Sequence, residues 1–472
     1  NQGVMIIKGG LSYHKSKKLS TSKVKFICTN CGKSFSKWAG KCLNCGEWNT
    51  LREQIEKTEK TTKIGFNRMD FNSARDFPYL LQDIPRLRIN RIITGSKEFD
   101  RVLGGGLVPG SLVLLAGDPG MGKSTLALQV ATFVGQKQPV LYVSGEESLN
   151  QIRLRSERLK LKPLLLHLFT ETNLDAILTQ LRKIKPHLII IDSVQTIFSE
   201  NFTGAQGSVS QVSNCANVLL QVAKITNIPV ILIGHVTKEG SVAGPMILEH
   251  VVDTILFLEG EKYHELRLLR VIKNRFGSTL EVGIFKMETK GLKEVSNPSG
   301  LFLKERLANQ PGSIIYPLIE GNRPLLVEIQ ALVNKTVLAY PRRAASGVNL
   351  NRLQVLIAVL EKCLNLKLFN MDVYVNIIGG FKVKEPAVDL AVCLAIISSI
   401  FNKPLPDSLA AVGEVGLLGD LRTVNQLDRR IEEVKRLGFK TCLIGGANLP
   451  KFSGITIKNF KSLKELLHFL NF

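Results

Sequence analysis

The chain has 472 residues, and 62 Lys and Arg against 40 Asp and Glu give it a formal net charge of +22. This length suits about three domains, and the charge favours a polyanionic partner, nucleic acid first and an acidic membrane surface second. No apolar run reaches the roughly 18 residues of a membrane span, and the basic start of the chain lacks the pattern of a secretory signal. We therefore expect a cytoplasmic protein that does not cross a membrane.

Composition and pattern divide the chain into successive segments. Residues 1–24 are polar and basic without periodicity, and they predict a flexible arm. Residues 25–50 contain clustered cysteines, and 51–90 have the mixed polar composition of a linker. Apolar runs alternate with longer amphipathic stretches over 91–290, and a second α/β pattern covers 291–472. The fold class that these patterns predict is α/β.

Two cysteine pairs in the N-terminal segment have the spacing of a structural zinc finger. Ten residues separate the pair Cys28 and Cys31 from the pair Cys42 and Cys45. Four thiolates fill the tetrahedral shell of Zn²⁺ and leave no open position, so we expect a structural site. Disulfides are the alternative, expected in a secreted chain. The other cysteines are scattered singly and are expected in hydrophobic cores; they are Cys215, Cys363, Cys393 and Cys442.

A nucleotide-binding P-loop is the strongest motif of the chain. An apolar run precedes it, a helix-like segment follows from Leu126, and its spacing is G-x-x-x-x-G-K-S. We expect backbone N–H groups to surround the phosphates of ATP, Lys123 to neutralise the β and γ oxygens, and Ser124 to bind Mg²⁺. A glycine-rich turn without nucleotide is the alternative. The motif residues are Gly117, Asp118, Pro119, Gly120, Met121, Gly122, Lys123, Ser124 and Thr125.

Short apolar runs predict the strands of a parallel sheet around this motif, because the amphipathic stretches between them are long enough for helices. These runs are 112–115, 140–143, 188–191 and 230–233. An antiparallel pair of strands is expected near 265–272 and 280–287, joined by a turn at Phe276 and Gly277.

Acidic residues follow two of the predicted strands at their carboxyl ends. Asp192 ends one apolar run, and we expect it to hold Mg²⁺ through water beside Ser124. Glu146 and Glu147 follow another run and reach the same edge of the sheet as the P-loop. Glu146 is the predicted base for the attacking water, with Glu147 in reserve. Two surface charges on a loop are the alternative.

Further candidate residues lie beyond these strands. His235 follows the run 230–233 and suits a sensor of the γ-phosphate, with a structural histidine as the alternative. Lys273 and Arg275 lie two positions apart on a predicted strand, so their side chains are expected to point the same way. In a ring of subunits they would face the ATP of the neighbour, with Arg275 as an arginine finger.

In this order the motifs resemble the RadA (Sms) family of bacterial DNA-repair ATPases. The resemblance runs from about Phe26 to the C-terminus. The segments that carry it are 28–49, 101–110, 234–240 and 273–277, the last with the sequence Lys-Asn-Arg-Phe-Gly.

This resemblance implies a RecA-like ATPase core in a hexameric ring that translocates on single-stranded DNA and promotes branch migration of recombination intermediates together with RecA. The loops 198–212 and 237–246 would face the channel of the ring, with Lys238 as a phosphate contact. The phosphate, magnesium, catalytic and trans-acting positions of the family fall on Lys123, Ser124, Asp192, Glu146, Lys273 and Arg275.

The segment 291–472 is similar to the protease domain of Lon, but it lacks the catalytic pair of that domain. Ala387 stands where the Lon pattern needs its Ser nucleophile, and no Lys stands in 426–429. The resemblance implies a non-proteolytic scaffold that supports the ring and binds duplex DNA. The predicted DNA contacts are Lys382, Lys384, Arg422 and Arg429. A Lon-like peptidase and a signalling ATPase of the KaiC type, which does not move on DNA, are the rival functions.

Overall fold

The computed structural model describes residues 24–28, 30, 33–35, 37–48, 50–55, 80, 82, 90–235, 245–260, 265–337, 340–446 and 452–472. The chain forms two compact units that divide between Asp76 and Phe77. Residues 1–23 of the predicted arm, most of the predicted linker, Cys31 and Lys238 lie outside the described residues.

The first unit contains a small antiparallel sheet in the order β2-β1-β3. Its strands are β1 (Val24–Cys28), β2 (Ser34–Phe35) and β3 (Leu51–Ile55). Phe26 pairs with Phe35, and Cys28 pairs with Leu51. The prediction that the finger ends at residue 50 is therefore wrong, because the following residues pair with β1 and do not begin a linker.

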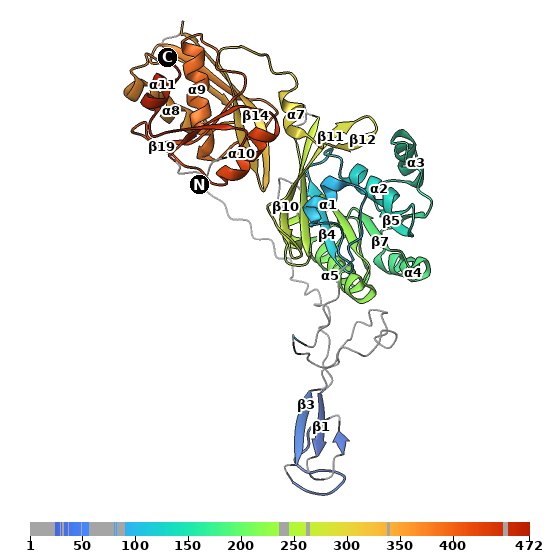
Figure 1. The fold of residues 1–472 in the computed structure, drawn as a ribbon. Helices are drawn as coiled ribbons and strands as arrows, with labels where there is room; N and C mark the ends of the chain where they lie inside the picture. The colour runs from blue at the N-terminus through green and yellow to red at the C-terminus, as the bar shows by residue number, and fades with distance from the viewer. Residues whose placement is uncertain are drawn as a thin grey trace, which may run out of the picture. The chain divides into compact units, whose positions relative to one another are not determined.

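Within the described residues, nine strands of the second unit form one sheet in the order β12-β11-β10-β9-β4-β8-β7-β5-β6 (Figure 1). The six strands from β9 to β6 in that order run parallel, which confirms the predicted parallel sheet. β10 and β11 form the predicted antiparallel pair. The strands are β4 (Leu112–Gly117), β5 (Val140–Ser144), β6 (Leu166–Thr170), β7 (Leu188–Asp192), β8 (Val230–His235), β9 (Thr254–Glu259), β10 (Leu266–Asn274), β11 (Val282–Glu288) and β12 (Gly291–Glu294).

Helices connect the parallel strands. Side chains that accept hydrogen bonds from the first free N–H groups fix the starts of several of them. Ser148 forms a capping box with Gln151 at the start of α3, and Asn173 caps α4. The helices of this part are α1 (Lys97–Leu103), α2 (Lys123–Val134), α3 (Leu149–Arg158), α4 (Leu174–Ile184), α5 (Val209–Thr226) and α6 (Pro245–Leu248).

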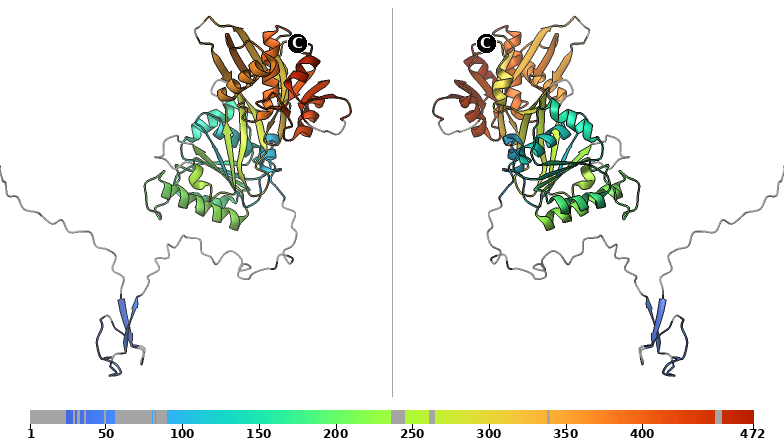
Figure 2. Two further views of the ribbon diagram at one scale, coloured as in Figure 1. Left: turned by 90° about the vertical axis from the view of Figure 1, so that its left-hand side faces the viewer. Right: turned by 90° about the vertical axis from the view of Figure 1, so that its right-hand side faces the viewer.

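The central strands of this sheet are buried on both faces, as their continuous apolar sequences predict. Alternate residues, such as Val113 and Leu115 of β4, pack in one core with α1 and α2. Their neighbours Leu112 and Leu114 point to the other face, where α5 contacts β4 and β8. The parallel part is therefore a three-layer structure with helices on both faces (Figures 1 and 2).

A mixed sheet in the order β15-β16-β14-β13-β17-β20-β21 organises the C-terminal part. The apolar helix α9 lies in its core. The strands, with the small pair β18-β19, are β13 (Ser313–Glu320), β14 (Arg323–Lys335), β15 (Arg343–Ser346), β16 (Met371–Ile377), β17 (Leu409–Val412), β18 (Glu414–Val415), β19 (Leu421–Arg422), β20 (Thr441–Gly445) and β21 (Thr456–Phe460). The helices are α7 (Pro298–Leu303), α8 (Leu350–Leu364), α9 (Asp389–Ile400), α10 (Leu427–Arg436) and α11 (Leu463–Phe469), with a 3-10 turn at Pro386–Val388.

The tip of the hairpin β13-β14 contacts the nine-stranded sheet. The backbone N–H of Asn322 donates to the carbonyl of Leu280 over 2.6 Å. Glu320, at the end of β13, pairs with Arg270 of β10, and Arg323, at the start of β14, pairs with Glu98 of α1. The two ion pairs therefore attach both strands of this tip to the nine-stranded sheet and its helix α1.

Among the described residues, no helix is both long and apolar enough to span a bilayer.

Candidate functional site

The P-loop connects β4 to α2 at the carboxyl edge of the parallel strands. Gly117 (φ 150°) and Gly122 (φ 101°) have backbone conformations that L-residues rarely adopt. A Cβ atom on Gly117 would lie 2.2 Å from the carbonyl oxygen of Leu258, so only glycine fits there. A Cβ atom on Gly120 would meet nothing within 4 Å. The backbone can therefore approach a ligand closely, and the first N–H groups of α2 suit a polyphosphate.

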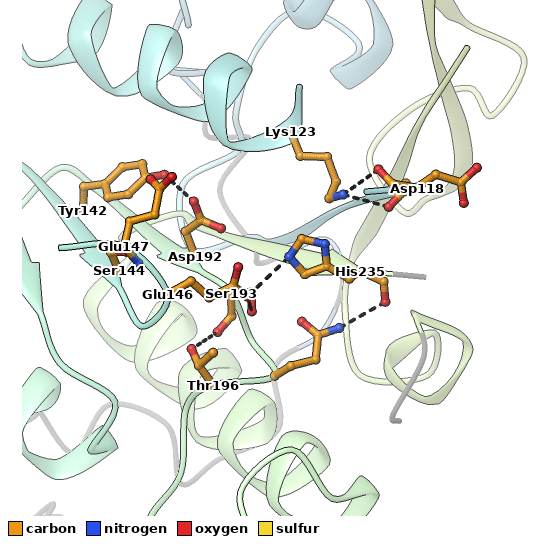
Figure 3. A network of polar contacts seen from close by, with 12 residues as sticks. Asp118, Lys123, Tyr142, Ser144, Glu146, Glu147, Asp192, Ser193, Thr196 and His235 are labelled. Carbon is orange, nitrogen blue, oxygen red and sulfur yellow. Dashed lines mark hydrogen bonds and ion pairs between the residues drawn. The ribbon is translucent and has the colours of Figure 1, made fainter. Parts of the chain in front are cut away.

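Lys123 is the first residue of α2, and its side chain is buried. Its Nζ donates to the carbonyl oxygens of Gly117 (2.8 Å) and Asp118 (2.9 Å), which ties the helix start to the loop (Figure 3). Burial lowers the pKa of Lys123, and the charges of Asp192, Asp118 and Glu146 oppose that shift. Asp118, Pro119 and Gly120 are exposed, Met121 is buried, and Ser124 and Thr125 are half-buried.

Asp192 lies at the end of β7, at the same edge of the sheet as the P-loop, and is buried. The hydroxyl of Tyr142 donates to its Oδ2 over 2.7 Å. Burial, followed by the charge of Asp192, raises the pKa of Tyr142 well above its ordinary value, so this hydroxyl remains a donor. One oxygen of Asp192 is therefore held by the hydroxyl of Tyr142. The carboxylate of Asp192 and the hydroxyl of Ser124 together are a donor set that suits Mg²⁺.

Glu146 lies just beyond β5 and contacts two neighbours from other strands (Figure 3). Its Oε1 accepts a short hydrogen bond from the hydroxyl of Ser193. His235 Nε2 lies 3.3 Å from the same oxygen, at an angle that does not make a hydrogen bond. The backbone oxygen of His235 accepts from Gln195 Nε2 over 3.2 Å. The structure thus brings Glu146 and His235 together.

Glu147 has different surroundings from Glu146. Its backbone N–H donates to Ser144 Oγ over 3.0 Å, and its carboxylate forms a short ion pair with Arg155 of α3. Burial raises the pKa of Glu147, Arg155 lowers it, and the charges of Asp192 and Glu146 raise it further. The carboxylate of Glu147 is occupied by a cation, whereas that of Glu146 faces a hydroxyl and an imidazole.

Buried polar atoms without a hydrogen-bond partner gather at this edge. In the described part of the chain they include Glu147 Oε2, Arg155 Nη1, Gln195 Oε1 and His235 Nε2. Such atoms are rare in folded proteins and are expected where the polar atoms of a ligand complete the network. Together with the glycine loop, they make this edge a fit for a nucleotide and its magnesium ion.

Sequence reasoning missed several of these partners: Tyr142, Arg155, Ser193 and Gln195. Ser193 and Gln195 follow Asp192 closely at a strand end, and that position was the available signal. The position of Arg155 in the sequence provided no such signal, because its contact with Glu147 depends on how α3 packs.

The predicted pair of trans-acting cations lies at the opposite edge of the sheet. Lys273 Nζ donates to the carbonyl oxygens of Glu249 and Val252, and Arg275 Nη1 lies 3.4 Å from Asp253 Oδ1. The prediction that both lie on one strand is wrong, because β10 ends at Asn274 after a bulge and Arg275 lies in the turn beyond it. Both side chains nevertheless reach the same segment, 249–253.

Register places this turn far from the P-loop of the same chain. Asn274 pairs with Thr254 at the start of β9, and Thr254 pairs with Val113 near the start of β4. The P-loop follows Gly117, at the other end of β4. The six residues of β4 span roughly 17 Å at the usual strand rise.

The second cysteine pair lies in a compact turn of the first unit. Cys42 is buried and packs with Phe35 and Ala39, and Cys45 is half-buried. The N–H of Gly46 donates to the carbonyl of Cys42 over 2.9 Å, and Gly46 has φ 79°. This tight turn directs two soft sulfur donors to one region, which suits zinc. Cys28 ends β1, and Cys31 lies outside the described residues.

The four predicted DNA contacts of the C-terminal part are all exposed. Lys382 and Lys384 are exposed in the segment after β16. Arg422 pairs with Asp420 over 2.8 Å, and Arg429 donates to Asn322 Oδ1 over 3.2 Å.

The predicted channel loop 198–212 is shorter than expected, because α5 begins at Val209. The buried side chain of Gln211 holds this loop by donating to the carbonyls of Ser199, Phe202 and Gly204. Of the second predicted loop, only its end at 245–246 is described, as the start of α6.

The positions predicted to match the catalytic pair of Lon carry neither a Ser nor a Lys. Ala387 is buried in the turn Pro386–Val388, and Asp428 lies in the first turn of α10. Next to them, the buried guanidinium of Arg430 pairs with Glu385 and also donates to Tyr316 Oη over 3.1 Å. An ion pair between a buried Arg430 and a half-buried Glu385 therefore lies beside these positions.

Parts of both units match known protein families. Residues 81–241 match the family described as AAA domain, and 26–53 match the family described as rubredoxin metal binding domain. The chain is 46% identical over 454 residues to DNA repair protein RadA of Bacillus subtilis (strain 168), covering 95% of this chain and 99% of that protein. It is 49% identical over 455 residues to DNA repair protein RadA of Streptococcus pyogenes serotype M1, with the same coverage.

The solved structure of the RadB recombinase is 28% identical in sequence to this chain, with a TM-score of 0.35. The alignment covers 43% of this chain and 99% of the RadB chain. The sequence identities, which extend over nearly the full length of both proteins, confirm the resemblance that the motifs predict. The chain, with a zinc ribbon at its N-terminus and a RecA-like P-loop ATPase domain after it, belongs to the RadA family of DNA repair proteins.

Proposed function

We propose that this chain is a DNA-stimulated ATPase that works as a hexameric ring, in which each subunit completes the ATP site of its neighbour. On this proposal the ring translocates on single-stranded DNA and promotes branch migration of recombination intermediates together with RecA in the cytoplasm. Branched DNA is its substrate.

The observation that carries this proposal is the separation of two sites within one subunit. The P-loop lies at the carboxyl edge of β4, and Lys273 and Arg275 lie beside the start of the same strand. An arginine side chain is too short to cross roughly 17 Å. Arg275 is 53% exposed, so it can meet an anion on another subunit. This arrangement supports action in trans, as an arginine finger requires.

Within one nucleotide site, the geometry supports a division of roles. The glycine loop and Lys123 bind the phosphates, and Glu146, held by Ser193, orients and deprotonates the attacking water. On this proposal His235 detects the γ-phosphate through its contact with Glu146. Ser124 and Asp192 would hold Mg²⁺, which neutralises developing charge on the phosphates when bound.

The remaining parts support DNA binding and assembly. Cys28, Cys31, Cys42 and Cys45 would hold a structural zinc ion that stabilises the N-terminal ribbon. We infer that the C-terminal domain, 291–472, is Lon-like in fold, and the absence of a hydroxyl at Ala387 supports a scaffold function for it in place of proteolysis. The net charge of +22 suits a polyanion. Proposed phosphate contacts are Lys238, Lys382, Lys384, Arg422 and Arg429.

An ATPase assay with and without single-stranded DNA tests this function. We expect DNA to raise turnover well above twofold, and the gain to fall as salt rises because phosphate contacts release counterions. Stimulation below about twofold at every salt concentration would instead favour a signalling ATPase that does not move on DNA. Casein degradation with ATP would favour the peptidase.

A further inference from the structure

Asp253 is a buried carboxylate beside the turn that carries Arg275. It lies directly before β9 and is 1% exposed. Its Oδ2 accepts from two donors, the backbone N–H of Leu112 at 3.0 Å and Lys224 Nζ of α5 at 2.8 Å. Because both donors hold the same oxygen, the orientation of the carboxylate is fixed. Its other oxygen, Oδ1, lies 3.4 Å from Arg275 Nη1.

The backbone of Asp253 reinforces this arrangement. Its N–H donates to the carbonyl of Leu112 over 2.9 Å, and its carbonyl accepts from the N–H of Arg275 over 3.1 Å. Arg275 is thus attached to Asp253 by main chain and side chain, and Asp253 is attached to the first residue of β4. Asp253 therefore links the start of the P-loop strand to the basic turn.

We propose that Asp253 is the positioning residue for Arg275, and that Lys224 fixes Asp253 for this task. The proposal rests on the proposed trans action of Arg275. A guanidinium on a turn has several rotamers, and holding it in one before the neighbour arrives removes that entropy from the catalytic step. The buried carboxylate binds one side of Arg275 and leaves the exposed side for the phosphate of the neighbour.

A purely structural role is the alternative, because a buried carboxylate that loses its charge commonly destabilises a fold. The two roles differ in how they combine with loss of Arg275. A positioning residue acts only through the residue that it positions, so its effect on kcat vanishes when Arg275 is absent. A structural defect acts in both backgrounds.

The experiment is a double-mutant cycle on full-length protein, with kcat of DNA-stimulated ATP hydrolysis as the readout. The variants are Asp253→Asn, Arg275→Ala and the two together. Asp372→Asn is the matched control, because this carboxylate is also buried and accepts a backbone N–H, but it lies on β16. ATP binding of each variant is measured separately with a fluorescent analogue.

We expect Asp253→Asn to lower kcat about tenfold, with ATP affinity unchanged, and to have less than about a twofold effect when Arg275 is already Ala. The control should leave kcat unchanged. If Asp253→Asn does not fold, Lys224→Met takes its place in the cycle, since Lys224 is 42% exposed and its loss removes an anchor of Oδ2 together with the contact of its ammonium with the Phe276 ring, 5.5 Å from the ring centroid.

Two results overturn the proposal in different ways. If Arg275→Ala lowers kcat and Asp253→Asn either leaves it unchanged or lowers it equally in both backgrounds, Asp253 does not act through Arg275, although trans action survives. If Arg275→Ala itself leaves kcat unchanged, the proposed function fails and the positioning role fails with it.

Discussion

At the scale of single residues, three carboxylates at one sheet edge differ by the partners that surround them. Asp192 accepts from Tyr142, Glu146 accepts from Ser193, and Glu147 pairs with Arg155. Burial raises the pKa of Glu147, but its Oε1 already accepts from the guanidinium of Arg155 and is therefore less available to take a proton from water. Glu146 has no such partner among the described residues, which is why we assign the water-activating role to it.

Glu146→Gln should therefore lower kcat by about a hundredfold or more while ATP still binds, since general-base catalysis contributes that much. The matched variant is Glu147→Gln, which keeps hydrogen bonding to Arg155 and should change kcat less than about tenfold. Single-turnover hydrolysis with a parallel binding assay measures both. A larger loss in Glu147→Gln than in Glu146→Gln would transfer the role to Glu147.

Buried thiols provide a second test at this scale. Burial raises the pKa of Cys215 and of Cys442 to about 12, and it raises the pKa of Cys393 further. At pH 8 only about one thiol in ten thousand would be ionised at a pKa of 12. We expect an alkylating reagent to leave these three unmodified in the native protein, as read by peptide mass spectrometry. Rapid modification of Cys215 in the folded chain would contradict its burial.

At the scale of elements, the hairpin β13-β14 contributes a tip that only glycine can form. Gly321 has φ 63°, and a Cβ atom there would lie 2.1 Å from the carbonyl oxygen of Leu280. That carbonyl also accepts from the N–H of Asn322. The tip therefore couples the C-terminal sheet to the segment between β10 and β11, two residues before β11 begins.

Gly321→Ala should lower the free energy of unfolding by more than the cost of a left-handed residue alone. Gly438 is the matched control, because it has φ 84° and a Cβ atom there would meet nothing within 4 Å. We expect Gly438→Ala to cost about 1 kcal/mol and Gly321→Ala about 3 kcal/mol or more. Urea unfolding measures both. Equal costs would show that the tip is not tightly packed.

Features set by neighbours in sequence were predictable, and features set by distant contacts were not. The P-loop, the parallel strands and Asp192 follow from local patterns. The bulge in β10 and the end of that strand at Asn274, before Arg275, leave no trace in the alternation of residues. The extension of the ribbon by β3 depends on pairing with β1, more than twenty residues earlier.

The candidate site shows the same limit. Glu146 was placed from its position after a strand, but its contact with Ser193 joins residues 47 positions apart. The proposed positioning role of Asp253 could not be predicted, because the partners of its carboxylate are Lys224, 29 positions away, and the backbone N–H of Leu112 at the start of β4. Polar contacts of this kind depend on packing, which a single sequence specifies only through the whole fold.

At the scale of the whole molecule, the P-loop and the basic turn of one subunit lie at opposite edges of one sheet. On the proposed function, such a subunit contributes one half to each of two sites, and a head-to-tail ring would join these halves into complete sites. Its activity should then depend on assembly, because ATP bound to an isolated subunit lacks Arg275 from a neighbour.

Mixing two inactive variants tests this claim most directly. Lys123→Ala removes the phosphate-binding lysine of the P-loop but retains Arg275. Arg275→Ala retains an intact P-loop but lacks the arginine. Assembled together at equal amounts, about one interface in four should pair an intact P-loop with an intact Arg275. We predict that the mixture recovers about a quarter of wild-type ATPase activity, while each variant alone has almost none. A mixture of assembled rings no more active than its components would contradict action between subunits.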